Sequence, residues 1–255
     1  MSLAKALQRP RILTLDIETS PAIVQTFGLH NTNIGISQIV EPTRVLCFAA
    51  KWHGEDEVMF FSEHHHSRAV MVQAAWDLLN QCDALCTYNG PAFDVKHLQA
   101  EFLLAGMTPP RPFKNIDLLR VVRSQFKFNS AKLDWVAQQL GLGSKVSHEG
   151  FGLWTACLAG DVDAWERFKA YNIQDVVLTE QLLDRLGPWV KTHPHFGMFN
   201  GDDSCCFRCG GTDFESHGDN ARTDLAVFEL FKCVGCGAWS RGAKRVFGIK
   251  VRGQK

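Results

Sequence analysis

An apolar stretch near the start of the chain carries two acidic residues at alternate positions. Residues 13–21 read LTLDIETSP, and their apolar residues are typical of a buried strand. Successive side chains of a strand point to opposite faces, so Asp16 and Glu18 share one face with Thr14, while the leucine and isoleucine side chains line the other. Two adjacent carboxylates repel each other and resist burial unless a positive partner lies between them. The stretch therefore predicts a buried strand whose acidic face needs a cation.

The size and composition of the chain are those of a soluble globular protein. Its 255 residues, 45% hydrophobic and 21% charged, are enough for one α/β domain and a small appendage. The first ten residues are too short and too polar for a signal peptide, and no apolar run approaches the length of a membrane span. We therefore predict a cytoplasmic protein without a membrane partner. The formal net charge is zero, so overall charge neither favours nor excludes an anionic partner.

The order of hydrophobic patterns predicts an α/β fold, with a mixed sheet flanked by helices. After the first strand we expect a long loop over 20–43, a hairpin formed by 44–52 and 57–61, and another strand within 83–90. Helices are expected at 68–81, 93–106, 116–126, 132–141 and 161–186.

The composition changes beyond about residue 190, where cysteine, glycine and charged residues replace the apolar pattern. This change predicts a first domain over 1–190, a linker over 191–203 and a small C-terminal unit over 204–255. The last part of that unit, 241–255, contains six lysines or arginines and no acid. It is either a solvated tail or an arm that contacts nucleic acid.

The long helix predicted at 161–186 carries an acid on its apolar face. The residues of this face are spaced by three and four positions: Phe168, Tyr171, Asp175, Leu178 and Leu182. An isolated aspartate on such a face is unfavourable by several kcal/mol, at least about 2, unless it is paired. Asp175 is therefore either part of a buried ion pair with an arginine, a residue at the boundary of the core, or a metal ligand.

A fourth acid, Asp94, follows the turn sequence YNGP at the start of a predicted helix, where a helix-capping role is the simple alternative. Taken together, four acids from a strand and two helices can meet on one sheet, and their motifs contain no lysine or arginine. Oxygen ligands of this kind suit Mg²⁺ or Mn²⁺. Two such ions about 3.5–4 Å apart can hold the attacking and leaving oxygens of a phosphoryl transfer. The pattern therefore predicts phosphodiester hydrolysis.

These motifs resemble those of the DEDD superfamily of 3′–5′ exonucleases, which have a ribonuclease-H-like fold. The first motif corresponds to Asp16-Ile17-Glu18, and the second, Asn-x-x-x-Phe-Asp, corresponds to residues 89–94. In the third motif Ala170 stands where one branch has histidine, and Tyr171 and Asp175 match the tyrosine branch, which includes polymerase proofreading domains. The resemblance covers roughly residues 10–187.

The resemblance implies a role for each matching residue. Asp16, Glu18, Asp94 and Asp175 would bind two Mg²⁺ or Mn²⁺ ions, and Tyr171 would orient the attacking water. The reaction would release 5′-mononucleotides from the 3′ end of DNA.

Three further residues are candidates for substrate binding. Asn89 and Phe93 lie in the second motif, although a turn residue and a core aromatic are equally good interpretations. Lys145, in a glycine-flanked loop, either contacts a phosphate or is solvated. RNA is the alternative substrate, and an inactive nuclease fold that serves as a binding module is the alternative function. The architecture suits a bacterial or phage replication or repair role.

Two Cys-x-x-Cys pairs lie in the C-terminal unit, each followed by glycine. They comprise Cys206 with Cys209 and Cys233 with Cys236. Four thiolates at this spacing form a tetrahedral site for structural Zn²⁺, and the segment resembles a zinc ribbon. Cys205 could replace Cys206, although its spacing is less favourable. We predict that the ribbon and the basic tail bind nucleic acid or a protein partner; the alternative is a cap that only stabilises the nuclease.

Overall fold

The computed structural model describes residues 9–28, 30, 33–145 and 150–250. They form two compact units, one over Arg11–Asp184 and a second that includes the described residues from Arg185 onward. Among the described residues, no helix combines the length and the apolar character that a membrane crossing requires.

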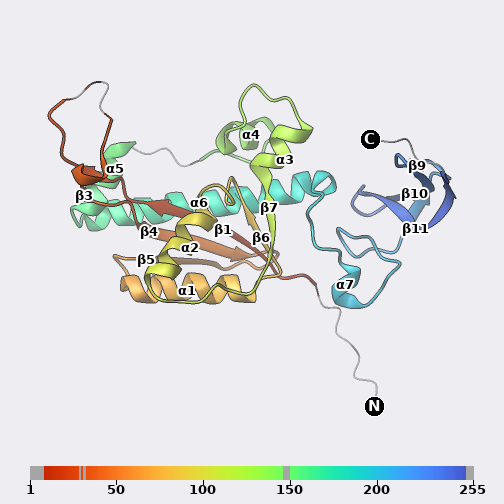
Figure 1. Ribbon diagram of the computed structural model, residues 1–255, viewed down its shortest axis with the longest axis horizontal. Helices are drawn as coiled ribbons and strands as arrows, with labels where there is room; N and C mark the ends of the chain where they lie inside the picture. Colours follow the sequence, from red (N-terminus) through yellow and green to blue (C-terminus); the bar gives the residue numbers. More distant parts are fainter. Residues whose placement is uncertain (1–8, 29, 31–32, 146–149, 251–255) are drawn as a thin grey trace, which may run out of the picture. The chain divides into compact units, whose positions relative to one another are not determined.

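The first unit is built on a five-stranded mixed sheet with the order β5-β4-β1-β6-β7 (Figure 1). Its central strand pairs antiparallel with β4 and parallel with β6, and β7 continues the parallel side. The hairpin of β4 and β5 is present as predicted. The strands are β1 (Ile12–Thr19), β4 (Val45–Trp52), β5 (Val58–Ser62), β6 (Ala84–Thr87) and β7 (Lys114–Asp117).

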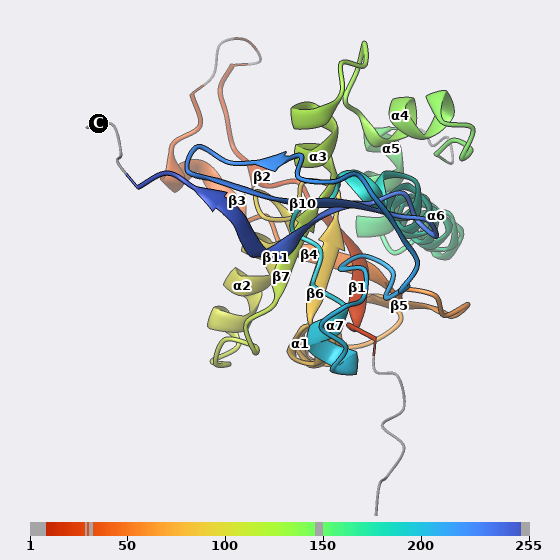
Figure 2. The ribbon, with the colours of Figure 1, turned by 90° about the vertical axis from the view of Figure 1, so that its right-hand side faces the viewer.

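Helices cover both faces of this sheet (Figures 1 and 2). The apolar face of β1 packs with α1 and α2, whose buried residues include Met71 and Leu98. On the opposite face, Leu46 of β4 packs with α5 and α6 through Leu153 and Phe168. This arrangement confirms the predicted mixed sheet flanked by helices. The helices are α1 (Arg68–Gln81), α2 (Asp94–Leu104), α3 (Leu118–Gln125), α4 (Leu133–Gln139), α5 (Phe151–Leu158) and α6 (Val162–Leu186).

The structure corrects the helix predicted at 116–126. Residues Lys114–Asp117 form strand β7, and the helix begins only at Leu118. Asp117 ends the strand and starts the helix, because its side chain accepts hydrogen bonds from the backbone N–H groups of Leu119 and Arg120 and so caps α3. Helix α5 was not predicted.

The segment predicted as a loop over 20–43 contains short regular structure. Strands β2 (Ile23–Val24) and β3 (Ile39–Glu41) pair antiparallel, and a 3₁₀ turn, η1 (Ile36–Gln38), precedes β3. The two strands are too short to produce a visible period of two in the sequence. Residues 29, 31 and 32 of this segment lie outside the described part of the chain.

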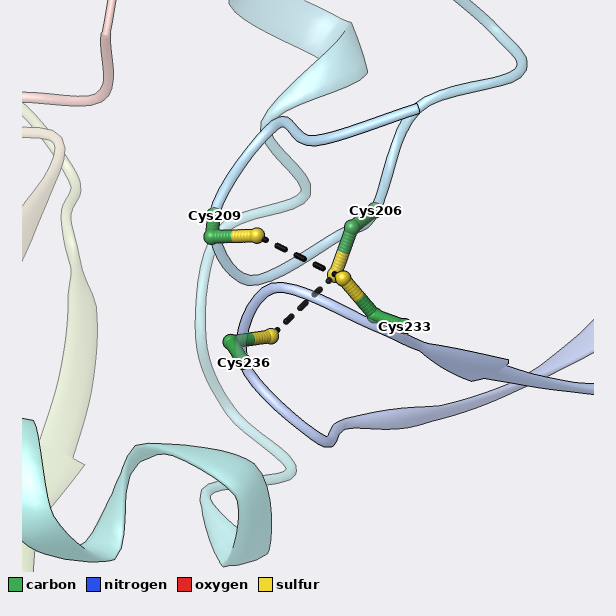
Figure 3. A group of neighbouring side chains, drawn as sticks. All are labelled: Cys206, Cys209, Cys233 and Cys236. Atoms are coloured by element: carbon green, nitrogen blue, oxygen red, sulfur yellow. Dashed lines mark hydrogen bonds between the residues drawn. The ribbon is translucent and has the colours of Figure 1, made fainter. Parts of the chain in front are cut away.

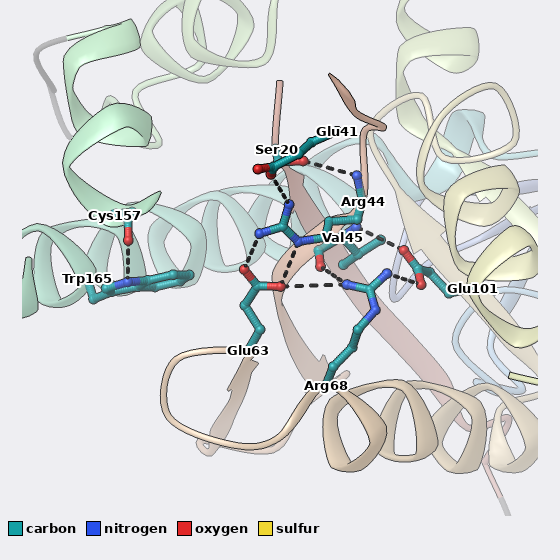
Figure 4. A network of polar contacts seen from close by, with 9 residues as sticks. All are labelled: Ser20, Glu41, Arg44, Val45, Glu63, Arg68, Glu101, Cys157 and Trp165. Atoms are coloured by element: carbon teal, nitrogen blue, oxygen red, sulfur yellow. Dashed lines mark hydrogen bonds and ion pairs between the residues drawn. The ribbon is translucent and has the colours of Figure 1, made fainter. Parts of the chain in front are cut away.

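Two arginines fix the beginning of β4 to its surroundings (Figure 4). Arg44 donates to both carboxylate oxygens of Glu63, at 3.0 and 2.9 Å. Arg68 of α1 forms an ion pair with Glu101 of α2 and donates to the carbonyl oxygen of Val45. The carboxylate of Glu101 also accepts from the backbone N–H of Val45, at 3.0 Å. Because β4 is hydrogen-bonded along β1, this network holds the acid-bearing strand in a fixed frame.

The turn between β6 and α2 leaves no room for a side chain at Gly90. A Cβ atom there would lie 2.1 Å from Oγ1 of Thr87, which also accepts the hydrogen bond from the Gly90 N–H. We expect Gly90→Ala to lower the free energy of unfolding by about 1–3 kcal/mol, since Thr87 is buried and has little space to move. Urea denaturation checks this, and Gly35→Ala is the control for loss of a glycine, because Gly35 has a φ of −78° and a Cβ there would make only ordinary contacts, the nearest 3.5 Å from Oε1 of Gln38. Equal effects of the two substitutions would contradict the steric argument.

The second unit is dominated by a small antiparallel sheet with the order β11-β10-β8, and β9 also pairs with β10. Strand β10 leads directly into the second Cys-x-x-Cys pair, because it ends at Cys233. The elements are η2 (Gly187–Trp189), α7 (Gly197–Asn200), β8 (Phe214–Ser216), β9 (Ala221–Arg222), β10 (Ala226–Cys233) and β11 (Trp239–Gly248).

Candidate active site and cysteine cluster

Three of the predicted acids come together at the first sheet. Asp16 and Glu18 extend from β1 toward α6, which contributes Asp175, and one carboxylate oxygen from each lies within 4.8 Å of the other two. The strand alternation produces this arrangement, because the same strand turns its apolar side chains to the opposite core. The predicted face of α6 is also observed, with Asp175 buried between buried apolar neighbours.

Asp94 lies beside this group rather than within it. Its Oδ1 accepts a hydrogen bond from the backbone N–H of Ile17, at 3.0 Å, between the two acids of β1. The side chain is 3% exposed and is the first residue of α2, where Phe93 occupies the N-cap position without a side-chain hydrogen bond. The simple capping alternative does not account for a carboxylate that bonds to a strand 77 residues away.

The electrostatics of the acid group favour neutralisation. Burial raises the pKa of Asp16 well above its ordinary value, and the charges of Asp94, Glu18 and Asp175 raise it further. Burial, followed by the charge of Asp175, raises the pKa of Glu18 to about 8. Burial also raises the pKa of Asp94 to about 7. These carboxylates therefore need protons or cations at neutral pH.

Lys145 supplies one positive charge to the acid group. Its ammonium group forms an ion pair with Asp175 and donates to the hydroxyl of Tyr171, at 3.2 Å. Burial lowers the pKa of Lys145, but the carboxylate of Asp175 outweighs this effect, and the net shift is upward. The motifs themselves contain no lysine or arginine, as the sequence shows, but the fold brings Lys145 from outside them to the acids. Asp175 is in a buried ion pair, as one alternative proposed, with lysine in place of arginine.

We expect Lys145→Met to destabilise the metal-depleted protein by about 2 kcal/mol. Breaking a fully buried ion pair costs about 3–5 kcal/mol, and the lysine side chain here remains 28% exposed. Added Mn²⁺ should reduce the loss, because a bound cation replaces the missing ammonium group. Urea denaturation in metal-depleted buffer, with and without Mn²⁺, measures both effects. Lys132→Met is the control, since Lys132 is an exposed lysine of the same cleft. A deficit that Mn²⁺ does not change would contradict the argument.

Tyr171 is buried next to the acids, one turn before Asp175 on α6. Burial, reinforced by the charge of Asp175, raises its pKa, so the hydroxyl keeps its proton at neutral pH. Its position allows it to accept from Lys145 and to donate to another group.

The other two predicted substrate residues lie outside the group of three acids. Asn89 has a φ of 81°, in the left-handed region, and its N–H donates to the carboxylate of Asp117, as expected of a turn residue. Phe93 is 40% exposed and contacts the ring of His97, so the interpretation as a core aromatic is wrong.

A cleft of about 570 Å³ opens beside the acids. Asp16 and Lys145 line it together with Tyr88, Arg123 and Lys132, which come from the segment between β6 and α4. Sequence reasoning missed Arg123 and Lys132, because surface cations on short helices carry no local signal. The lining also includes one further acid, Asp134, whose carboxylate accepts from the backbone N–H of Lys145 at 2.7 Å. The three cationic side chains in the lining suit a phosphate-bearing substrate.

A further residue that sequence reasoning missed is Asn172. Its Nδ2 donates to both the carboxylate Oδ2 and the backbone oxygen of Asp16, at 2.8 and 3.2 Å. The side chain is fully buried. The sequence signal that could have identified Asn172 is a polar residue on the buried side of α6, directly after Tyr171. Asn172 positions Asp16 against α6.

The four predicted cysteines of the second unit form one cluster (Figure 3). One sulfur from each of Cys206, Cys209, Cys233 and Cys236 lies within 4.8 Å of the others. The Sγ–Sγ distances are 3.6 Å for Cys206 to Cys236 and for Cys209 to Cys233. Tetrahedral bonds of about 2.3 Å to Zn²⁺ would place the sulfurs roughly 3.8 Å apart, so the donor set fits this ion. Cys205 is not part of the cluster, and its Sγ contacts the carbonyl oxygen of Asp202 instead.

The family model of the RNase_H superfamily matches residues 13–187, so the chain belongs to this superfamily. This match confirms the predicted ribonuclease-H-like fold. Among solved structures, a family B DNA polymerase from the hyperthermophilic archaeon Pyrobaculum calidifontis is similar, with a TM-score of 0.54 and 19% identity. The similarity covers 70% of this chain and 25% of the polymerase chain, and at this identity it shows a shared fold. A comparison with curated proteins gives no match. The superfamily and the acidic centre together support nuclease activity in general terms.

Proposed function

We propose that this protein is a metal-dependent 3′–5′ exonuclease that acts on DNA and releases 5′-mononucleotides. The observation that carries the proposal is the convergence of Asp16 and Glu18 of β1 with Asp175 of α6, more than 150 residues later in the sequence, beside a cleft that three cationic side chains line. The motifs that contain these residues resemble those of the tyrosine branch of DEDD exonucleases.

The donor set suits two Mg²⁺ or Mn²⁺ ions, because all the ligand atoms are carboxylate oxygens. Asp16, Glu18 and Asp175 would bind the ions directly, and Asp94, one step removed, would act through water or by holding β1 at Ile17. When bound, such ions lower the pKa of water and stabilise charge on the scissile phosphate.

The remaining residues of the site position the reactants. Tyr171, whose hydroxyl keeps its proton, would donate to the attacking water or to a phosphate oxygen. Lys145 would turn from Asp175 toward a substrate phosphate once metal ions neutralise the acids. Arg123 and Lys132, which line the cleft, would bind the backbone of the strand. Asn89 and Phe93 do not line this cleft, and their substrate role rests on the motif resemblance alone.

DNA is the substrate we favour because the fold is shared with part of a DNA polymerase and the motifs match the branch that includes proofreading domains. An exoribonuclease of the same chemistry is the near alternative, since discrimination depends on contacts to the 2′-OH. The cysteine cluster is proposed to hold structural Zn²⁺, because protein sulfurs fill all four tetrahedral positions.

The test uses single strands of DNA and RNA labelled at either the 3′ or the 5′ end, with Mg²⁺ or Mn²⁺. The proposal predicts immediate release of the 3′ label as a mononucleotide and a ladder of shortening 5′-labelled products, with DNA cleaved faster. A circular single strand should resist cleavage. Cleavage of the circle, or release of the 5′ label first, would refute the proposed direction. Binding without cleavage would instead favour the inactive module.

We expect Tyr171→Phe to lower the cleavage rate by about 10²-fold, in the range typical for loss of a proton-transfer or water-orienting group. Metal binding should be preserved, because the carboxylates are unchanged. Single-turnover cleavage and Mn²⁺ titration measure the two properties separately. Tyr88→Phe is the matched control, since Tyr88 donates to the carbonyl oxygen of Ala131 in the wall of the cleft. Equal cleavage rates for the two variants would show that the Tyr171 hydroxyl has no specific role in the cleavage step.

A further inference from the structure

The second unit contains a pocket that the proposed nuclease reaction does not use. It has a volume of about 440 Å³ and is formed entirely by residues of this unit. Three phenylalanines line it, Phe214 from β8 and Phe228 and Phe231 from β10, and β11 contributes Ser240 and Arg241. The cysteine cluster anchors these strands, because Cys233 ends β10.

The walls of the pocket combine flat apolar surfaces with a few polar groups. Phe214 and Phe231 meet edge to face, with ring centroids 6.1 Å apart. The guanidinium carbon of Arg241 lies 4.4 Å from the centroid of the Phe228 ring. The hydroxyl of Ser240 is buried and has no hydrogen-bond partner among the described residues. Asp203, an exposed acid, adds an acceptor to the lining.

An unpaired nucleobase matches this combination. Aromatic side chains stack on base faces, and a stacked guanidinium group can contact the base and its phosphate together. The Asp203 carboxylate can accept from donors on the polar edge of a base, and the Ser240 hydroxyl can donate to an acceptor there. A polyanion is favoured over a peptide because 241–250 carries four positive charges, on Arg241, Lys244, Arg245 and Lys250, and no acid.

We propose that this pocket binds a base of single-stranded nucleic acid, which gives the protein a second contact with its substrate outside the acidic cleft. The proposal rests on the proposed nuclease function for the identity of the substrate. The pocket can nevertheless be tested by binding alone.

The test measures the affinity of the zinc-loaded 255-residue chain for fluorescein-labelled dT30 by fluorescence anisotropy. All proteins carry Asp16→Asn, which prevents cleavage. Phe228→Leu should weaken binding of dT30 about tenfold, in the range for loss of one stacked base, and should leave the affinity for an abasic strand of equal length nearly unchanged. Arg241→Gln should weaken both strands. Arg222→Gln is the control for loss of one arginine, since Arg222 is exposed on β9 and does not line the pocket.

A second variant guards against misfolding of the first. Gly242→Leu should fill the pocket from β11, where a Cβ atom would make only ordinary contacts, the nearest 3.6 Å from Cε2 of Phe231. Zinc content and thermal melting verify that each variant is folded. Unchanged dT30 affinity in folded Phe228→Leu or Gly242→Leu protein would overturn the proposal, and so would equal losses for Arg222→Gln and Arg241→Gln. A pocket that serves a peptide would give the first of these results.

Failure of this inference can be distinguished from failure of the nuclease proposal. If the wild-type protein shortens DNA while the pocket variants bind dT30 normally, only the pocket assignment is wrong. If the wild-type protein cleaves no nucleic acid while Phe228→Leu and Gly242→Leu lose affinity, the pocket assignment stands and the nuclease proposal fails.

Discussion

Replacing Asp16 with asparagine is expected to abolish cleavage and, at the same time, to stabilise the metal-depleted protein. Loss of a metal-binding carboxylate should reduce the cleavage rate on the order of 10⁴-fold, similar to the removal of other groups that act as a unit in catalysis. The carboxylate lies in a site where burial and three neighbouring acids oppose its ionisation. Removal of the Asp16 charge therefore relieves repulsion in the folded state. If the substitution lowers the pKa of a neighbouring acid by roughly one unit, the free energy of unfolding rises by about 1–2 kcal/mol.

The direction in which stability changes with pH is a second, independent test of the repulsion among these acids. Burial raises the pKa of Glu18 from 4.5 to about 8 and that of Asp94 from 3.8 to about 7. Between the unfolded-state and folded-state pKa of each acid, the folded state binds more protons than the unfolded state. The free energy of unfolding is therefore highest at the low-pH end of this range and falls as the pH rises. We expect the metal-depleted protein to lose stability as the pH rises from about 5 to 8. Asp16→Asn should make this slope shallower.

Denaturant titrations at several pH values, combined with Mn²⁺ addition, test the whole argument. Mn²⁺ should stabilise the wild-type protein most at high pH, where the acids are ionised, and should stabilise Asp16→Asn much less. Asp77→Asn is the matched control, because Asp77 is exposed on α1 and should leave rate, slope and Mn²⁺ response unchanged. Stability that rises with pH in the metal-depleted protein would show that the acids are already neutralised by other means.

The parts of the site that sequence could predict are those fixed by local periodicity. Alternation along β1 separates the acids from the apolar residues whatever the neighbouring strands are, and the three-four spacing on α6 places Asp175 on the buried face. Both predictions are confirmed, because the apolar residues that define the period of the strand or helix are also the residues that the core buries. Convergence of the acids was inferred from the cost of burying them separately.

The parts that could not be predicted depend on contacts distant in sequence. Strand β7 is four residues long, and its pairing with β6 overrides the helical pattern that follows it. Lys145 reaches Asp175 across 30 positions with a flexible side chain, and no periodicity encodes such a pair. Asn172 and the phenylalanine pocket of the second unit likewise acquire meaning only when other elements pack against them.

The second large effect is expected from Cys206→Ser, which should abolish Zn²⁺ binding and unfold the C-terminal unit. The apolar core at the cysteine cluster is small: its buried residues are Cys206, Cys233 and Ala238, with a few half-buried neighbours. So small a core offers little stability of its own, whereas structural Zn²⁺ contributes about 10–16 kcal/mol of apparent binding free energy in comparable small domains. The first unit has its own cores and should keep its melting transition.

Cys205→Ser is the matched control, because it makes the same chemical change one position earlier. The Cys205 thiol contacts the carbonyl oxygen of Asp202 and lies outside the four-sulfur group, so this variant should retain one Zn²⁺ per chain. Elemental analysis gives the zinc content, and limited proteolysis should cut only Cys206→Ser rapidly after residue 190. If Cys206→Ser kept its zinc while Cys205→Ser lost it, the neighbouring cysteine would be the ligand. Zinc retention by both variants would mean that three thiolates are enough to bind the ion. The fourth coordination position would then be open to water, and the site would not be the closed, purely structural site that we propose.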